Sequence, residues 1–179
     1  MTISGIHFGI LYATITGRRN NIFRSEVVRA YIGMMLIATL FIAASLRSEG
    51  IYPSFLESLR HASFQVVSIT TTSGFATADT NLWTPLAIIL LVFCSIVCGC
   101  AGSTSGGIKV DRLLLATKVI RNRINMQQHP NAVISTKTDG TVQGDNVLNL
   151  VMTFIVAYLL LALAGTVVYA MFGCDIMTS

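Results

Sequence analysis

The residues best suited to chemistry lie at positions 68–79, in the stretch SITTTSGFATAD. This stretch combines threonine and serine hydroxyls with a glycine, and apolar sequence flanks it on both sides. Backbone carbonyl oxygens of an extended segment can replace the water shell of a dehydrated cation, hydroxyls can add uncharged oxygens, and glycine permits carbonyl orientations that a Cβ atom prevents. The residues that we expect to coordinate a cation in this way are Thr71, Thr72, Ser73 and Gly74.

A second segment of similar composition, GCAGSTSGG, covers residues 99–107 and interrupts an apolar run that begins at Thr84. Each glycine inside a helix costs about 1 kcal/mol relative to alanine. Irregular backbone at membrane depth is tolerated only where it is buried in protein or lines a water-filled cavity. The segment therefore predicts a functional break in a membrane helix.

A helix over residues 53–69 must position the hydroxyl-rich stretch. Pro53 suits a helix start, and apolar residues recur at helical spacing after it. Glu57 and Arg60 would be costly against lipid, and the helix runs directly into the threonines. We interpret it as a re-entrant pore helix; an interfacial amphipathic helix is the alternative. Its C-terminal end carries about half a negative charge, which favours cations.

The composition excludes a water-soluble globular domain. The chain is 53% hydrophobic and 11% charged, with a mean hydropathy of +0.70, whereas soluble domains have about 25% charged residues. Apolar runs at 30–46, 84–100 and 147–173 predict transmembrane helices, and the first covers roughly 25 Å, near the lower limit for a span. We expect an all-α membrane protein, in which a membrane–pore–membrane unit with a re-entrant pore helix and a broken second helix precedes one further transmembrane helix.

The predicted organisation has five parts along the chain. These are a cytoplasmic N-terminal linker at 1–29, the membrane–pore–membrane unit at 30–108, a cytoplasmic helix extension with a hairpin linker at 109–146, a transmembrane helix at 147–173 and an outer end at 174–179. Within the unit we expect a span at 30–46, the pore helix at 53–69, the filter at 70–75, a second span at 84–100 and the broken loop at 99–107.

The basic residues predict the orientation. Segments 1–29 and 109–146 hold ten of the twelve lysines and arginines: Arg18, Arg19, Arg24, Arg29, Lys109, Arg112, Lys118, Arg121, Arg123 and Lys137. Cytoplasmic loops carry an excess of such residues, so the N-terminus and the linker are expected to be cytoplasmic. Three spans agree with this orientation only if residues 53–83 enter the membrane and return to the outer side.

The sequence VVSITTTSGFATAD, followed by a span and then by GCAGSTSGGIKVDRLLL, resembles the Trk/Ktr/HKT superfamily of potassium transporters, in particular its bacterial TrkH type. Members carry four membrane–pore–membrane units around one pore, and GIHFGILY is similar to the segment that joins the second and third units. The resemblance implies that this chain corresponds to the third unit and the first span of the fourth. It implies potassium uptake by monovalent cation conduction, in the inner membrane of a bacterium.

The resemblance also assigns residue roles. Gly74 corresponds to the signature glycine of the selectivity filter, and the carbonyl groups of Thr71, Thr72 and Ser73 line potassium sites. The residues that correspond to a loop gating the pore below the filter are Gly99, Gly102, Ser103, Thr104, Ser105, Gly106 and Gly107. Lys109 and Arg112 lie at the cytoplasmic exit, where they could couple the loop to a regulator or simply anchor the helix at the membrane surface.

The expected partners are membrane lipid, the remaining pore units of the same transporter, a second copy in a homodimer and a cytoplasmic nucleotide-binding regulatory subunit. We expect potassium as the substrate and no cofactor, transition metal, nucleic acid or enzymatic activity. A phosphate-binding loop at GSTSGGIK is excluded, because Ile108 stands where that motif requires lysine. The alternatives to conduction are a secondary ion-coupled transporter, whose broken helices also bind ions, and a non-conducting fragment.

Overall fold

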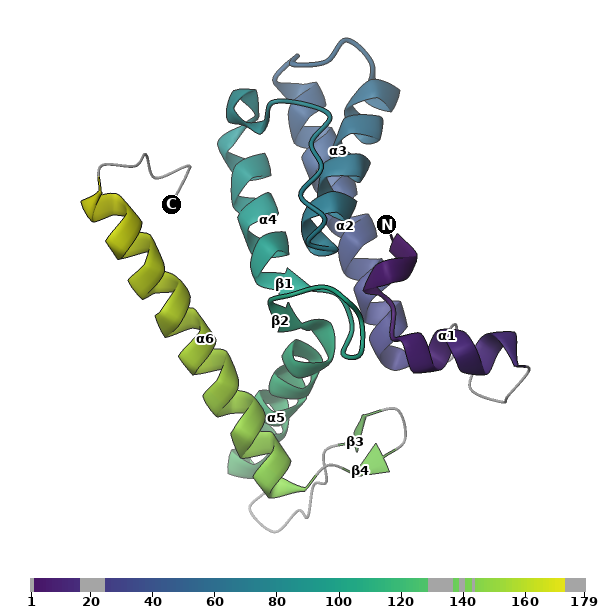
Figure 1. Cartoon of the computed structure of the whole chain (residues 1–179), viewed down its shortest axis with the longest axis vertical. Coiled ribbons are helices and arrows are strands. Elements are labelled where there is room, and N and C mark those ends of the chain that lie inside the picture. Colours follow the sequence, from purple (N-terminus) through teal and green to yellow (C-terminus); the bar gives the residue numbers. More distant parts are fainter. Residues whose placement is uncertain (1, 17–24, 129–136, 139–140, 143, 173–179) are drawn as a thin grey trace. The chain divides into compact units, whose positions relative to one another are not determined.

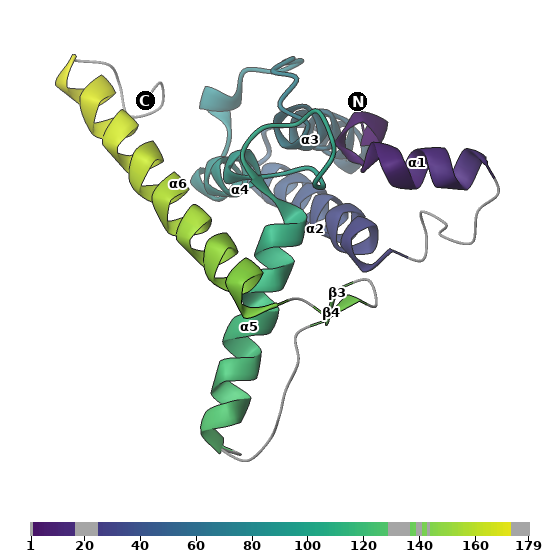
Figure 2. The ribbon, with the colours of Figure 1, turned by 60° about the horizontal axis from the view of Figure 1, so that its bottom comes forward.

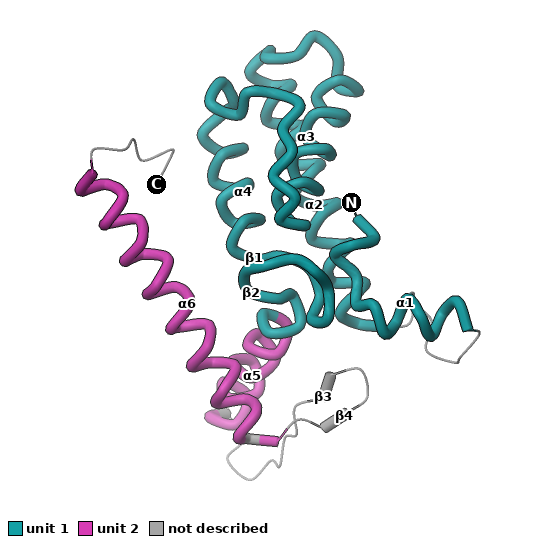
Figure 3. The backbone as a smooth tube through the Cα atoms, viewed as in Figure 1, with its two compact units in different colours: residues 1–113 teal, residues 114–179 magenta. Residues whose placement is uncertain are grey.

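The computed structural model describes residues 2–16, 25–128, 137–138, 141–142 and 144–172. The chain divides into two compact units, residues 1–113 and 114–179 (Figure 3). The predicted outer end at 174–179 and three basic residues of the N-terminal linker, Arg18, Arg19 and Arg24, lie outside the described residues.

Helices build almost all of the first unit, which is drawn from purple to teal in Figure 1. Its elements are the 3-10 helix η1 (Thr2–Gly5), α1 (Phe8–Ile15), α2 (Glu26–Ser48), α3 (Phe55–Thr70), the 3-10 helix η3 (Thr80–Leu82) and α4 (Pro85–Ile96). Two-residue strands, β1 (Val97–Cys98) and β2 (Ile108–Lys109), pair in parallel after α4. The all-α fold predicted from the sequence is confirmed.

Helix α2 contains the first predicted span but is longer than residues 30–46, because it extends over 23 residues. Exposed basic residues near both ends, Arg29 and Arg47, are part of the helix, since such side chains can reach the membrane surface from within a span. One face of α2 is buried against α3 and α4, whereas Leu36 and Phe41 on another face are about 60% exposed. A helix that is apolar on both faces fits a membrane surrounding.

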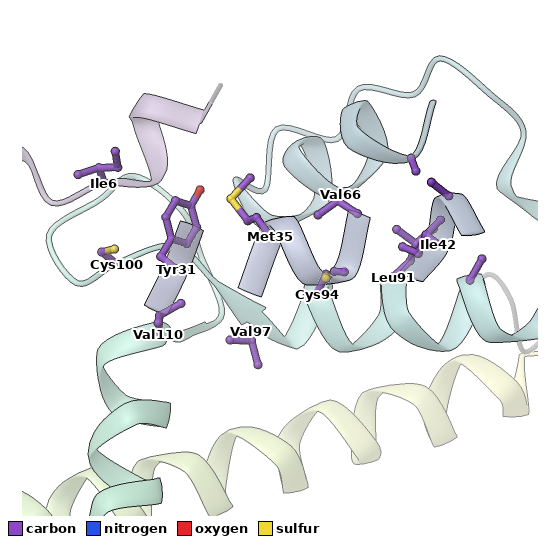
Figure 4. Close-up of a cluster of buried hydrophobic side chains, with 14 of the residues drawn as sticks. Ile6, Tyr31, Met35, Ile42, Val66, Leu91, Cys94, Val97, Cys100 and Val110 are labelled. Carbon is purple, nitrogen blue, oxygen red and sulfur yellow. The ribbon is translucent and has the colours of Figure 1, made fainter. Parts of the chain in front are cut away.

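The core of the first unit lies where α2, α3 and α4 meet. Met35 and Ile42 of α2, Val66 of α3, and Leu91 and Cys94 of α4 converge there (Figure 4). All five side chains are buried, and Ile42, Val66 and Cys94 are fully so. This packing fixes the pore helix against the two helices that flank it in sequence.

The segment between α2 and α4 leaves one end of the unit and returns to the same end. In Figure 1 the chain descends through α3 and then runs back beside this helix to the start of α4. The hydroxyls of Ser45, near the end of α2, and of Thr84, the N-cap of α4, lie 2.6 Å apart. This geometry is that of a re-entrant excursion.

Helix α4 ends at Ile96, before the predicted limit of residue 100. Val97 and Cys98 pair instead with Ile108 and Lys109, so the helical path breaks two residues before Gly99. At 1.5 Å per residue the twelve residues of α4 cover about 18 Å, less than a membrane core. The second helix therefore ends earlier, and the break that follows it begins earlier, than the sequence predicts.

The second unit holds most of α5 (Val110–Gln128), the strands β3 (Lys137–Thr138) and β4 (Thr141–Val142), and α6 (Asp145–Met171). The two strands pair antiparallel, which agrees with the predicted hairpin, although Asp139 and Gly140 themselves lie outside the described residues. Helix α6 is long and apolar enough to cross a membrane, and only 6% of its most apolar window is buried.

Candidate functional site

The candidate filter begins where α3 ends. Thr71 is the C-cap of the helix, and two following residues have left-handed backbone, Thr72 with φ of 54° and Gly74 with φ of 73°. This conformation costs an L-residue with a Cβ about 1–2 kcal/mol, so Thr72 is held there by its surroundings. A Cβ at Gly74 would meet nothing within 4 Å. Glycine is therefore favoured at position 74 by its conformation and not by lack of space.

The hydroxyls of this segment fasten it to its own helix. Thr70 Oγ1 donates to the carbonyl of Val66 at 2.6 Å, and Thr71 Oγ1 donates to that of Val67 at 2.7 Å. The Ser73 hydroxyl lies 3.2 Å from the carbonyl of Ser68. These hydroxyls therefore have a structural role at the helix end.

The carbonyl groups of the same segment are left available. Residues 72–74 are exposed and adopt no regular secondary structure beyond the turn. Among the described residues, no donor reaches the carbonyl oxygens of Thr71, Thr72, Ser73 or Gly74. These oxygens lie directly after the C-terminal end of α3, which carries about half a negative charge. The arrangement can offer oxygen ligands to a cation and disfavours an anion.

Two buried polar residues of α3 hold the return segment, and neither is among the site residues predicted from the sequence. Ser68 Oγ donates to the carbonyl of Phe75 at 2.6 Å, and Gln65 Nε2 donates to that of Ala78 at 3.1 Å. The spacing of these residues in the sequence could have indicated this role, because together with Ala62 they recur at helical spacing on the buried face of α3. A polar residue at a core-facing position of a pore helix is therefore a candidate support for the filter.

The loop of residues 99–107 connects β1 to β2 and packs against the N-terminal segment, which lies beside it in Figures 1 and 2. Cys100 N donates to the carbonyl of Gly5 at 2.8 Å, and Phe8 N donates to that of Gly102 at 3.3 Å. A Cβ at Gly99 would lie 2.7 Å from the Gly5 oxygen. The loop is thus seated on backbone that is distant in sequence.

Two charged side chains after the loop turn back onto it. Lys109 Nζ donates to the carbonyl of Ser105 and lies 3.4 Å from both the carbonyl and the hydroxyl oxygen of Ser103. Both carboxylate oxygens of Asp111 lie 2.9 Å from Ala101 N. Arg112, predicted beside Lys109, lies half-buried in the first turn of α5.

One hydrogen bond joins the filter segment to the loop. Gly106 N donates to Thr72 Oγ1 at 3.2 Å, across 34 residues of sequence. The structure therefore brings the predicted filter and the predicted gating loop into direct contact. Gly102 and Thr104 lie instead toward the N-terminal segment, where Thr104 Oγ1 is 3.4 Å from the carbonyl of Ser4.

The comparisons with known proteins agree with this architecture. The model of the family TrkH, cation transport protein, matches residues 39–178. The Trk system potassium uptake protein TrkH of Salmonella typhimurium is 36% identical over 177 residues, which are 98% of this chain and 36% of that protein. The protein of the same name from Escherichia coli K12 is 34% identical over equal shares.

A solved structure shows the same fold. The crystal structure of the potassium transporter TrkH from Vibrio parahaemolyticus matches with a TM-score of 0.88 and 31% sequence identity, over 97% of this chain and 38% of that one. The chain therefore spans about a third of the length of the relatives that it matches. In sequence and in fold, the chain belongs to the TrkH family of cation transport proteins.

Proposed function

We propose that this chain supplies one pore unit to a potassium-uptake transporter, with residues 71–74 as its part of the selectivity filter. The observation that carries the proposal is the division of labour at the end of α3. The hydroxyls of Thr71 and Ser73 bind the helix, while the carbonyl oxygens of residues 71–74 have no donor among the described residues. Potassium channels bind the dehydrated ion through such carbonyl oxygens.

A single unit provides only part of a coordination shell. Filter oxygens from several units must surround one ion for carbonyls to replace its water. The relatives named as potassium uptake proteins are about three times longer than this chain, which leaves room for further units. We therefore propose that other pore units of the same transporter complete the filter, and that potassium is its substrate, with transport and not enzymatic conversion as the activity.

We further propose that the loop of residues 99–107 gates the pore. Its Gly106 contacts Thr72 at the base of the filter segment, which supports a position across the ion path. The loop leaves a short α4, and hydrogen bonds join it to the N-terminal segment and to Thr72. A small movement of residues 102–107 would therefore change the path.

The exposed apolar surfaces and the distribution of basic residues support a location for the chain in the membrane. The exposed apolar faces of α2 and α6 fit contact with lipid or with further membrane helices. The excess of lysine and arginine in 1–29 and 109–146 supports a cytoplasmic N-terminus in the inner membrane of a bacterium. By membership of the family, we propose a homodimer with a cytoplasmic nucleotide-binding regulatory subunit, to which Lys109 and Arg112 could couple the loop.

Potassium uptake at low external potassium, in a host that lacks its own uptake systems, tests the filter. The protein is expressed from its complete gene, unaltered, as Gly74→Ala and as Gly50→Ala. Gly50 is a matched control, because its φ is 69° and a Cβ there also meets nothing within 4 Å. We expect Gly74→Ala to lose most uptake and Gly50→Ala to retain it. Equal uptake by both variants would contradict the filter and favour a secondary transporter.

A further inference from the structure

The loop of residues 99–107 contains a cluster of oxygen atoms gathered around one positive charge. The carbonyls of Ser103 and Ser105 and the hydroxyl of Ser103 all face the ammonium group of Lys109. The two serine hydroxyls lie 2.8 Å apart, and that of Ser103 also donates to the carbonyl of Cys100 at 2.6 Å. Ser105 is 5% exposed, so the cluster lies partly inside the protein.

The chemistry of this cluster is that of a monovalent cation site. Carbonyl and hydroxyl oxygens are the ligands that channels offer to dehydrated cations. A lysine ammonium is a compact unit charge with three donors, and hydrogen bonds to a charged group are stronger than neutral ones. Here the oxygens are already occupied, because the chain supplies the cation itself.

We propose that Lys109 is a positioning residue that holds the loop closed by acting as a permanently attached cation. Its ammonium gathers the carbonyl oxygens of Ser103 and Ser105, and this fixes the turn that carries Gly106 to Thr72. Asp111 supports the opposite end of the loop through Ala101 N. The effect of this lysine on transport rests on the proposed gating role of the loop, whereas its effect on loop order does not.

Anchoring of the helix at the membrane surface would require a different placement of the Lys109 side chain. An anchoring lysine places its ammonium in water or among lipid headgroups. The Lys109 side chain is half-buried, and its ammonium contacts three oxygens of the loop. A purely anchoring role predicts that loss of the charge leaves the loop unchanged, which separates the two roles experimentally.

Amide hydrogen exchange of residues 99–107 measures the order of the loop. The protein, expressed from its complete gene, is compared with Lys109→Met, which keeps chain length but has no donor, and Lys109→Arg, which keeps charge and donors. Arg121→Gln is the control, because it removes one positive charge from an exposed position of the same helix. Exchange within α2 is the internal reference, and the ratio of loop exchange to α2 exchange is compared, so that general destabilisation cancels.

We expect this ratio to rise about tenfold or more in Lys109→Met, since local opening governs exchange and a charge-assisted bond is lost. Lys109→Arg should restore most of the protection, and Arg121→Gln should resemble the unaltered protein. An unchanged ratio in Lys109→Met would overturn the proposal.

Potassium uptake by the same variants tests the gate separately. Higher basal uptake by Lys109→Met supports both the role of Lys109 in holding the loop closed and the loop as a gate. Faster loop exchange with unchanged uptake supports the role of Lys109 and overturns the loop as a gate. Loss of uptake in Gly74→Ala remains the separate test of the filter, so failure of one proposal does not conceal failure of another.

Discussion

The filter segment at residues 70–75 and the loop at residues 99–107 have similar compositions and opposite hydrogen-bonding patterns. Both are rich in glycine, serine and threonine, and both interrupt helical structure. In the filter segment the hydroxyls of Thr70, Thr71 and Ser73 bind the preceding helix, and the carbonyls of residues 71–74 have no donor among the described residues. In the loop, hydroxyls bind one another and a lysine occupies the carbonyls. Neighbouring residues therefore decide whether such a segment offers oxygens or withholds them.

The two segments also differ in how far away their supports lie. Ser68 and Gln65 reach the return segment from the adjoining helix, across 7 and 13 residues of sequence. The loop is seated on Gly5, about a hundred residues earlier in the chain, and on the side chains that follow it. The proposed filter segment is thus fastened to the helix that precedes it, whereas the loop depends on contacts with the distant N-terminal segment.

The largest expected effect comes from Gly99→Ala, which disturbs the loop and the Gly5 backbone beside it. A Cβ there would meet the Ser105 hydroxyl at 2.5 Å and Gly5 backbone at 2.7 Å, and overpacking of this kind costs about 1–3 kcal/mol. We expect faster exchange of residues 99–107 and higher basal potassium uptake, with unchanged selectivity for potassium over sodium. Gly106→Ala is the control, because its Cβ would approach only Thr72 Cγ2, at 3.9 Å. Lower selectivity in Gly99→Ala would show that filter and loop are one structural element.

A smaller effect is expected from Ser68→Ala, which disturbs the filter alone. The substitution removes the hydrogen bond to the carbonyl of Phe75, worth about 1 kcal/mol. Potassium selectivity, measured as competition between potassium and sodium uptake, should fall while loop exchange stays unchanged. Ser63→Ala serves as control, since the hydroxyl of Ser63 binds only its own helix, at the carbonyl of Arg60. Equal selectivity in both variants would remove Ser68 from the filter's support.

The smallest effect is expected from Thr72→Val, which removes the hydrogen bond that joins Thr72 to Gly106. Valine keeps the branched shape and the same left-handed strain, so only the hydroxyl that accepts from Gly106 N is lost. We expect loop exchange to rise about fivefold, as for one neutral hydrogen bond of about 1 kcal/mol, with selectivity nearly retained. A selectivity loss as large as that of Ser68→Ala would mean that the Thr72 hydroxyl serves the filter directly.

Much of this architecture was predictable from the sequence, because it depends on local pattern. The charged, short pore helix, its run into threonines and the glycine-rich break all follow from residue types in order. The early end of α4 was not predictable in this way, because Val97 is apolar and suits a helix in a span; its strand pairing with Ile108 depends on a partner beyond the loop.

The side-chain directions at the site were less predictable than its location. The positive-inside rule treats Lys109 as a surface charge, and only the folded loop shows its ammonium facing Ser103 and Ser105. The left-handed backbone of Thr72 is likewise imposed by tertiary context, since threonine alone disfavours it. The sequence thus predicted which segment offers carbonyl oxygens, but not the side chains that fasten that segment.

The contact between Ser45 and Thr84 has a consequence for how such a pore can change over time. These residues meet at 2.6 Å although 39 positions separate them, so α2 and α4 form a frame whose two ends already touch. The chain between Ser45 and Thr84, which includes α3 and the proposed filter segment, is therefore an insert whose two ends are held together. The frame bears the entropic cost of closing that insert, and this cost grows only slowly with the insert's length. The turns that join α3 to α2 and to α4 can thus be lengthened, shortened or exchanged without rebuilding the scaffold that carries them.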